Sequence, residues 1–272
     1  MSDAVQITAK PQSSRETYTY DTFTTGLILE DLHFRATDPA PGQKVPAFDM
    51  ELIEGGRLRS SDLGQEPVLL VFGSRTCPVT VSSRAPLERL FEKFGDKIRF
   101  VLVNTREAHP GELISQPKSI EQKRDHARNL GTFMGAHFET AVDDIDGSFH
   151  RAMGPKPNSA YIIAPDGRII FRAHWANDTA SLEPALEAAT TGTQPRQVKS
   201  RRLVRPLLKA IGYLPDVVRT AGRKVERDVW RAVPPFAVMG HLSRLFFFLP
   251  IDMRGPAVVL LLALGGGLLI WG

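Results

Sequence analysis

The feature that most constrains the fold is an apolar segment, PVLLVFGS, that spans residues 67–74. It starts at a proline, reaches a glycine at its end and carries no charged residue. A short continuous apolar run of this kind is typical of a strand that is covered on both faces. Such strands lie in the middle of sheets that have helices on both sides. The segment therefore predicts an α/β domain.

The residues that follow predict a strand–helix–strand unit. Between Leu87 and Phe94 apolar residues recur at spacings of three and four, with charged residues between them. This pattern indicates an amphipathic helix, and Gly95 marks its end. The next segment, IRFVLV at residues 98–103, predicts a second buried strand. Because a helix connects the two strands, we expect them to pair in parallel.

The other predicted elements complete a known order. A hairpin that turns at Gly55-Gly56 precedes the first buried strand, and a hairpin that turns at Pro165-Asp166-Gly167 follows later in the chain. The remaining elements are a helix at 119–130, a strand at 139–142, a helical turn at 149–153 and a helix at 182–189. The order βαβ, α, ββ, α predicts a thioredoxin-like fold with a central mixed sheet, flanking helices and a peroxiredoxin-type N-terminal hairpin.

Cys77, the only cysteine, lies where the first buried strand turns into the helix. Backbone N–H groups at a helix N-terminus favour the thiolate, and Pro78 suits the first helical position. Arg75 adds a positive charge nearby. The alternative is an inert thiol that fills the end of the strand. Because polar residues flank Cys77 outside the apolar run, we interpret it as reactive.

A single cysteine limits the chemistry. It excludes an internal disulfide and suits a reducing compartment. Thr80 occupies the position where a two-cysteine reductase would carry its second thiol, so Cys77 needs an external thiol such as glutathione or thioredoxin. No bound cofactor is expected. A one-cysteine peroxidase would carry a threonine three residues before its cysteine, where this chain has Ser74.

Two segments resemble the iodothyronine deiodinases and their bacterial deiodinase-like relatives. The Gly-Ser-x-Thr-selenocysteine-Pro segment of that family is matched by GSRTCP at residues 73–78, with cysteine in place of selenocysteine. The Glu-Ala-His-Pro segment is matched at residues 107–110, directly after the second buried strand. The resemblance extends over about residues 46–187. One position departs from the animal enzymes, because Pro117 stands where they have a second site histidine.

The resemblance implies a role for each matched residue. Cys77 is the nucleophile that attacks the substrate's iodine, His109 is a proton donor or substrate clamp, and Glu107 orients the site together with Thr76. Ser74 and Arg75 are assigned to substrate binding.

The position of His109 supports this assignment independently. It follows the second buried strand at the sheet edge where Cys77 lies, and open α/β sheets bind ligands at that edge. The alternative is a loop histidine bonded to its own turn. Pro157 is either a cis-proline opposite Cys77 or an ordinary turn proline. The other histidines show no metal-ligand spacing and are expected to be structural or solvated: His33, His126, His137, His150, His174 and His241.

The C-terminal part of the chain has a different composition. Residues 196–231 hold eleven Lys or Arg against Asp216, Glu226 and Asp228, a local net charge of +8. Residues 256–272 then carry no charge and would span about 25 Å as a helix. We expect residues 193–254 to be a basic amphipathic juxtamembrane segment and residues 255–272 to be a single-pass anchor, with the domain facing the cytoplasm. The alternatives are nucleic-acid binding, which we do not favour, and a buried hairpin.

These observations lead to one leading hypothesis. Residues 1–38 are a flexible arm without a secretory signal, and residues 39–192 are a redox domain. The domain is predicted to be a membrane-tethered, deiodinase-like oxidoreductase that acts on a small-molecule or thiol substrate and is reset by an external thiol. The alternatives are a one-cysteine peroxidase and a non-catalytic adaptor at a membrane. A homodimer is left open.

Overall fold

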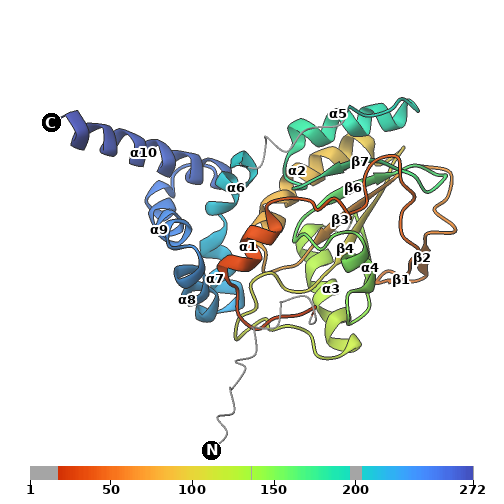
Figure 1. Cartoon of the computed structure of the whole chain (residues 1–272), viewed down its shortest axis with the longest axis horizontal. Helices are drawn as coiled ribbons and strands as arrows, with labels where there is room; N and C mark the ends of the chain where they lie inside the picture. Colours follow the sequence, from red (N-terminus) through yellow and green to blue (C-terminus); the bar gives the residue numbers. More distant parts are fainter. Residues whose placement is uncertain (1–17, 136, 197–203, 272) are drawn as a thin grey trace, which may run out of the picture.

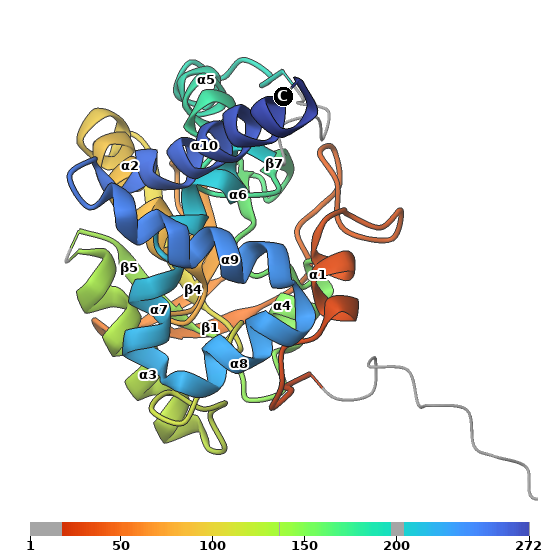
Figure 2. The ribbon, with the colours of Figure 1, turned by 90° about the vertical axis from the view of Figure 1, so that its left-hand side faces the viewer.

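The computed structural model describes residues 18–135, 137–196 and 204–271, and Figure 1 shows the whole chain. A layered α/β body holds the sheet, and a group of helices from the C-terminal part of the chain lies against one end of it (Figures 1 and 2). The two parts meet around the helix that follows Cys77.

The sheet has seven strands in the order β2-β1-β5-β4-β3-β6-β7. At its centre β3 pairs in parallel with β4 and antiparallel with β6, and β4 pairs in parallel with β5. Every residue of β3 is buried, as its sequence predicts. The strands are β1 (Asp49–Leu52), β2 (Arg57–Arg59), β3 (Val68–Gly73), β4 (Arg99–Asn104), β5 (Glu139–Val142), β6 (Ala160–Ile163) and β7 (Ile169–Ala173).

Helices and loops cover both faces of the sheet. On one face α2 (Pro78–Phe94), α3 (Ile120–Met134) and α5 (Thr179–Thr190) pack on alternate residues of β3, such as Leu69 and Val71. On the other face the intervening residues pack against α4 (Ser148–Ala152) and the β1–β2 hairpin. Since successive side chains of a strand point to opposite faces, one apolar strand supplies both cores.

This topology is the thioredoxin-like fold. The β3–α2–β4 unit and the antiparallel β6–β7 pair followed by α5 confirm the predicted order of elements. The N-terminal hairpin is also confirmed, and β1 joins the sheet beside β5. Boundaries differ by a few residues, since α3 continues to Met134 and α5 begins at Thr179.

The N-terminal segment differs from the expected arm over residues 1–38. Residues 18–38 pack on the body, and they include α1 (Thr25–Asp31). Phe23 and Leu27 are buried against Ala232 of the C-terminal helices. The Tyr18 hydroxyl lies 2.8 Å from Nδ1 of His150. The expectation was therefore wrong for residues 18–38, whereas residues 1–17 lie outside the described residues.

The C-terminal segment folds onto the body. Its helices are α6 (Val204–Ile211), α7 (Leu214–Ala221), α8 (Arg223–Ala232), α9 (Pro234–Leu242), the short helix η2 (Ser243–Phe246) and α10 (Ile251–Trp271). Val217, Ala221, Val225 and Val229 of α7 and α8 form one buried cluster with Val81 of α2. The apolar faces of these amphipathic helices thus pack on protein, and the juxtamembrane role of residues 193–254 stays a prediction. We call α6 to α9 the cap, and Figure 2 shows it from its outer side.

Residues 255–271 of the predicted membrane anchor lie within α10, and residue 272 is outside the described residues. Among the described residues, no individual helix combines the length and apolarity needed to cross a bilayer. Pro234–Phe246 and Ile251–Leu264 meet that test only as a pair, and they are bent by 112°. The anchor stays a prediction.

Candidate active site

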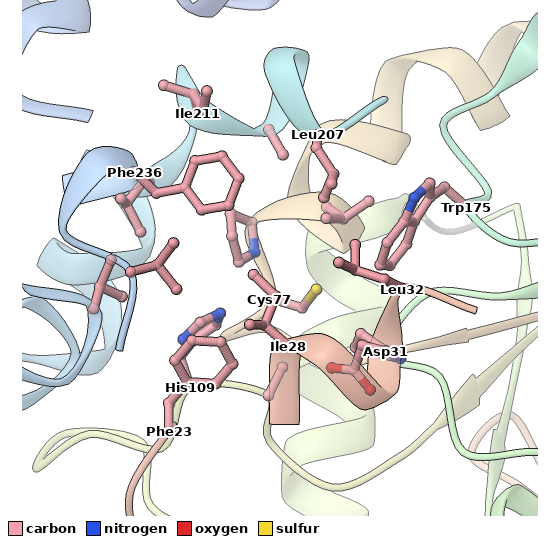
Figure 3. A pocket seen from close by; sticks show the side chains of 18 residues that line it. Phe23, Ile28, Asp31, Leu32, Cys77, His109, Trp175, Leu207, Ile211 and Phe236 are labelled. Carbon is pink, nitrogen blue, oxygen red and sulfur yellow. The ribbon is translucent and has the colours of Figure 1, made fainter. Parts of the chain in front are cut away.

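Cys77 occupies the N-cap of α2, and Pro78 is at the first turn of the helix, as the sequence predicts. The thiol is 2% exposed. It packs in a cluster with Val79, Trp175 and Ala210, and Leu207 lies against that cluster (Figure 3). Because Leu207 and Ala210 belong to α6, the cap covers the thiol.

This burial changes the expected acidity of the thiol. Desolvation raises the pKa of Cys77 to about 11, since a thiolate is poorly stabilised among apolar side chains. The N–H groups of Thr80 and Val79 and the Thr80 hydroxyl act in the opposite direction, but they do not compensate. The expectation of an acidic thiol is therefore wrong for this closed arrangement. Cys77 is protonated at neutral pH until the site opens or a ligand changes its surroundings.

Glu107 connects the two matched segments. Its Oε2 accepts hydrogen bonds from the Thr76 hydroxyl at 2.6 Å and from the Thr76 N–H at 3.2 Å. The same hydroxyl accepts a hydrogen bond from the N–H of His109 at 3.1 Å. Glu107 and Thr76 are fully buried. This network fixes the loop that carries His109 against the turn that carries Cys77.

A further histidine completes the network. Nδ1 of His126 lies 2.9 Å from Oε1 of Glu107, and Gln116 exchanges two hydrogen bonds with the Glu107 backbone. The sequence predicts that His126 is structural or solvated. It also shows Pro117 at the position where the animal enzymes have their second site histidine. The sequence does hold a signal that His126 faces the protein interior. His126 lies about one helical turn from Lys123 and from Leu130, which are both on the buried face of α3.

His109 lies in the site, but it is not a cation. Its ring centroid is 4.2 Å from that of Phe23, and its Nδ1 is buried without a hydrogen-bond partner among the described residues. Desolvation lowers the pKa of His109 to about 4, so the imidazole is neutral at pH 7. It can clamp a ligand or donate a neutral hydrogen bond, whereas proton donation as an imidazolium is disfavoured.

Ser74 and Arg75 support the site from outside it. Oγ of Ser74 accepts a hydrogen bond from the N–H of Ala108 at 3.1 Å. The Arg75 guanidinium lies 3.9 Å from the ring centroid of Phe133 and 3.6 Å from the carboxylate of Asp216 on α7. Neither residue lines the cavity at Cys77 within the described part of the chain. Their role in substrate binding stays a prediction.

A cavity of about 90 Å³ lies beside Cys77, lined by residues of α1, α2, α6, α7, α8, α9 and adjoining loops (Figure 3). Its titratable lining residues, among those described, are Asp31, Cys77 and His109. The rest of the lining is mainly apolar, and Nε1 of Trp175 is buried without a hydrogen-bond partner among the described residues. The cavity therefore suits an apolar ligand that carries a polar group.

Several residues that line the cavity were not predicted from the sequence to be site residues. Asp31, Trp175 and the cap lie far from Cys77 in the sequence, and no local pattern marks them. Pro157 lines the cavity as one sequence reading suggested, but the described residues contain no cis peptide bond. Those residues also contain no group of three or more His, Cys, Asp or Glu that could hold a metal ion.

Known proteins resemble this chain over the region that contains both motif segments. A family model described as iodothyronine deiodinase matches residues 17–173, more than half of the chain. No curated protein matches the sequence.

The chain is similar to several solved structures over about half of its length or more. An uncharacterized conserved protein from Geobacillus kaustophilus is 18% identical, with 58% of this chain and 85% of that chain covered and a TM-score of 0.47. A hypothetical protein from Sinorhizobium meliloti is 17% identical, with coverages of 61% and 95% and a TM-score of 0.47. A thiol-disulfide oxidoreductase from Bacteroides fragilis is 15% identical, with coverages of 52% and 98% and a TM-score of 0.40.

Proposed function

Because the chain belongs to the iodothyronine deiodinase family, we propose that it is a thiol-dependent oxidoreductase that removes iodine from an aromatic substrate with Cys77 as nucleophile. The observation that carries the proposal is the common cavity of Cys77 and His109. Thr76 and Glu107 hold the two segments that supply these residues. A thiol redox role is the coarser conclusion that the family supports.

The lining of the cavity supports an aromatic substrate. Apolar walls favour a ring, and the buried polar atoms of His109 and Trp175 are available to a phenol or a similar group. Yet a protein cavity that binds benzene has a volume of roughly 150 Å³. The cavity at Cys77, at about 90 Å³, is smaller. A substrate of that size must therefore displace some of the lining side chains as it enters.

The proposed reaction needs two external thiols in each cycle. The Cys77 thiolate attacks iodine, the carbon–iodine bond breaks with its electron pair on carbon, and that carbon takes a proton. The resulting sulfenyl iodide reacts with one external thiol to give a mixed disulfide, iodide and a proton. A second thiol releases the disulfide and restores Cys77. The net change converts one aryl iodide and two thiols into the deiodinated arene, one disulfide, iodide and a proton.

The test uses two aryl iodides of different size, thyroxine and 4-iodophenol, each with excess dithiothreitol. The proposal expects iodide release by the wild type and none by Cys77→Ser, with His109→Ala impaired. Glu121→Ala is a matched surface control, since the Glu121 side chain is 72% exposed and outside the cavity. Hydrogen peroxide is tested in parallel. Peroxide consumption without iodide release would replace the proposal with a one-cysteine peroxidase, and inactivity with both would favour the adaptor.

We also propose that the C-terminal end of the chain binds a membrane, with the redox domain on the cytoplasmic side. Large apolar side chains are exposed along this end, including Phe247 at 75% and Phe248 at 68%. On α10 the exposed apolar residues are Met253, Leu260, Leu261, Leu262 and Leu264. Arg244 and Arg254 line one surface hollow together with Phe247 and suit anionic headgroups. A surface of this kind favours insertion into one leaflet as readily as a span.

A further inference from the structure

The proposed reaction moves a proton twice, off the Cys77 thiol and onto the carbon that loses iodine. His109 is held as a neutral imidazole, because its surroundings disfavour the charged form. A neutral imidazole is a weak acid, so it is a poor source of the second proton. The site therefore needs another group that exchanges protons near neutral pH.

Asp31 lies in the required position. It is the last residue of α1, it is 9% exposed, and it lines the cavity that contains Cys77 and His109 (Figure 3). Its backbone oxygen accepts a hydrogen bond from Nε2 of His174, which holds the end of the helix. Among the described residues its carboxylate has no hydrogen-bond or ion-pair partner. The carboxyl group is thus available to a ligand.

Packing alone does not explain a carboxyl group at this place. A buried charge without a partner costs free energy, and the C-terminal end of a helix disfavours a negative charge. A leucine or asparagine would fill the position without that cost. Unfavourable burial of a titratable group beside a reactive residue is typical of functional sites.

The charges around Asp31 come from several elements. Desolvation by burial is the largest influence and raises the pKa of Asp31, Arg106 and Lys156 lower it, and Glu30 raises it. The result is a pKa of about 7. The other titratable neighbours are Tyr20, Cys77 and His174. No other cavity-lining group among the described residues has a pKa this close to neutrality.

We propose that Asp31 is the proton-exchanging residue of the Cys77 site. The Asp31 carboxylate accepts the thiol proton as sulfur attacks iodine, and the Asp31 carboxylic acid then gives that proton to the carbon from which iodine has left. One S–H bond and one C–I bond break, and one S–I bond and one C–H bond form. The inference rests on the proposed deiodination for its second half. The first half rests on the electrostatic coupling between the Asp31 carboxylate and the Cys77 thiol, and this coupling exists whether or not the substrate is an aryl iodide.

The test combines two readouts on Asp31→Asn, with Glu121→Gln as control. The Glu121 carboxylate is 72% exposed on α3 and lies outside the cavity. The first readout is kcat for iodide release from 4-iodophenol between pH 6 and 8. The second is the rate at which iodoacetamide alkylates Cys77 over the same range. Thermal unfolding of both variants shows whether each is folded.

The proposal expects opposite changes in the two readouts. Asp31→Asn lowers kcat by about 10²-fold or more and removes the rise of kcat with pH around neutrality. It also speeds alkylation, because the loss of a nearby negative charge makes the thiol more acidic. Glu121→Gln changes neither.

Other results overturn the inference in separable ways. Unchanged kcat in Asp31→Asn refutes it while deiodination by Cys77 stands. If kcat and the alkylation rate both fall in Asp31→Asn, Asp31 has only a structural role, and the inference is also refuted. If the wild type releases no iodide, the proposed function fails; the alkylation rates alone then decide, since equal rates in the wild type and Asp31→Asn exclude communication between Asp31 and the thiol.

Discussion

The carboxylate of Glu112 accepts a hydrogen bond of 2.8 Å from the backbone N–H of Lys224, the second residue of α8. It accepts another of 2.7 Å from the N–H of Arg223. Glu112 lies three residues after His109 on the same loop. A Cβ at Gly111 would collide with the carbonyl oxygen of Ala221, so the loop and the cap are in close contact. The loop that places His109 therefore also holds the cap over Cys77.

The first prediction concerns this contact. Glu112→Ala leaves the first N–H groups of α8 without their acceptor, so the cap should loosen. We expect faster alkylation of Cys77 by iodoacetamide, because the covered thiol becomes accessible more often. Glu121→Ala, a change on the exposed face of α3, should leave the rate as in the wild type. Equal rates in all three proteins would mean that this contact does not restrain the cap.

The second prediction concerns the hydroxyl that joins the two motif segments. Thr76→Val removes a hydrogen bond from a fully buried carboxylate and should lower the free energy of unfolding by ~1–3 kcal/mol. Thr76→Ser keeps the hydroxyl and should lose less than half as much. Urea unfolding at pH 7 measures both. A valine variant as stable as the serine variant would show that the Glu107 network contributes nothing through this hydroxyl.

The third prediction concerns the dependence of stability on pH. The pKa of Asp31 rises from 3.8 to about 7 on folding, so between these values the folded protein holds a proton that the unfolded chain has lost. Its contribution to stability therefore falls as pH rises through this window. Asp31→Asn should become more stable relative to the wild type by up to ~4 kcal/mol between pH 4 and 8.

His109 should act in the opposite direction. Its pKa falls from 6.5 to about 4 on folding, so the unfolded chain binds the additional proton. The contribution of His109 to stability consequently rises with pH between those values. In His109→Gln the free energy of unfolding should therefore increase less between pH 4.5 and pH 7 than in the wild type, as measured by urea unfolding. A constant difference between this variant and the wild type over that range would contradict the burial of a neutral imidazole.

The fourth prediction concerns the membrane. Burial of a phenylalanine in an apolar phase contributes roughly 1.5–3 kcal/mol, so each of Phe247→Ser and Phe248→Ser should weaken partitioning about tenfold. Flotation with phosphatidylcholine vesicles containing phosphatidylserine measures this. Leu29→Ser, at an exposed position on α1, is the control. If the wild-type protein does not float with the vesicles, these residues do not bind membranes. If both variants bind as tightly as the wild type, other residues are responsible for membrane binding.

The central elements could be predicted because their signals are local. The continuous apolar run at β3 and the heptad-like spacing in α2 each specify an element and what it must be packed against. The position of Cys77 at the N-cap follows from the same residues. Its burial does not, because Ala210 and Leu207 reach it from positions more than a hundred residues away.

The terminal segments show the limit of such patterns. An amphipathic helix must bury one face, but its sequence does not say what covers that face. The charge pattern of residues 196–231 predicts contact with lipid headgroups, but it does not reveal that Val217 and Val225 pack with Val81 of α2. The seven-residue helix α1 has no capping side chain, and it depends on packing against Ala232. Asp31 could not be recognised as a site residue from the sequence, because its place in the cavity depends on how α1 packs against distant segments.

The most direct test of the account is a single turnover without reductant. Wild-type protein is mixed with equimolar 4-iodophenol and dimedone, a reagent for sulfenic acids, which form when a sulfenyl iodide meets water. Mass spectrometry then measures the Cys77 adduct against the phenol released. The account predicts one adduct at Cys77 per phenol formed, and neither product with Cys77→Ser. Phenol formation by the wild type without an adduct at Cys77 would contradict it.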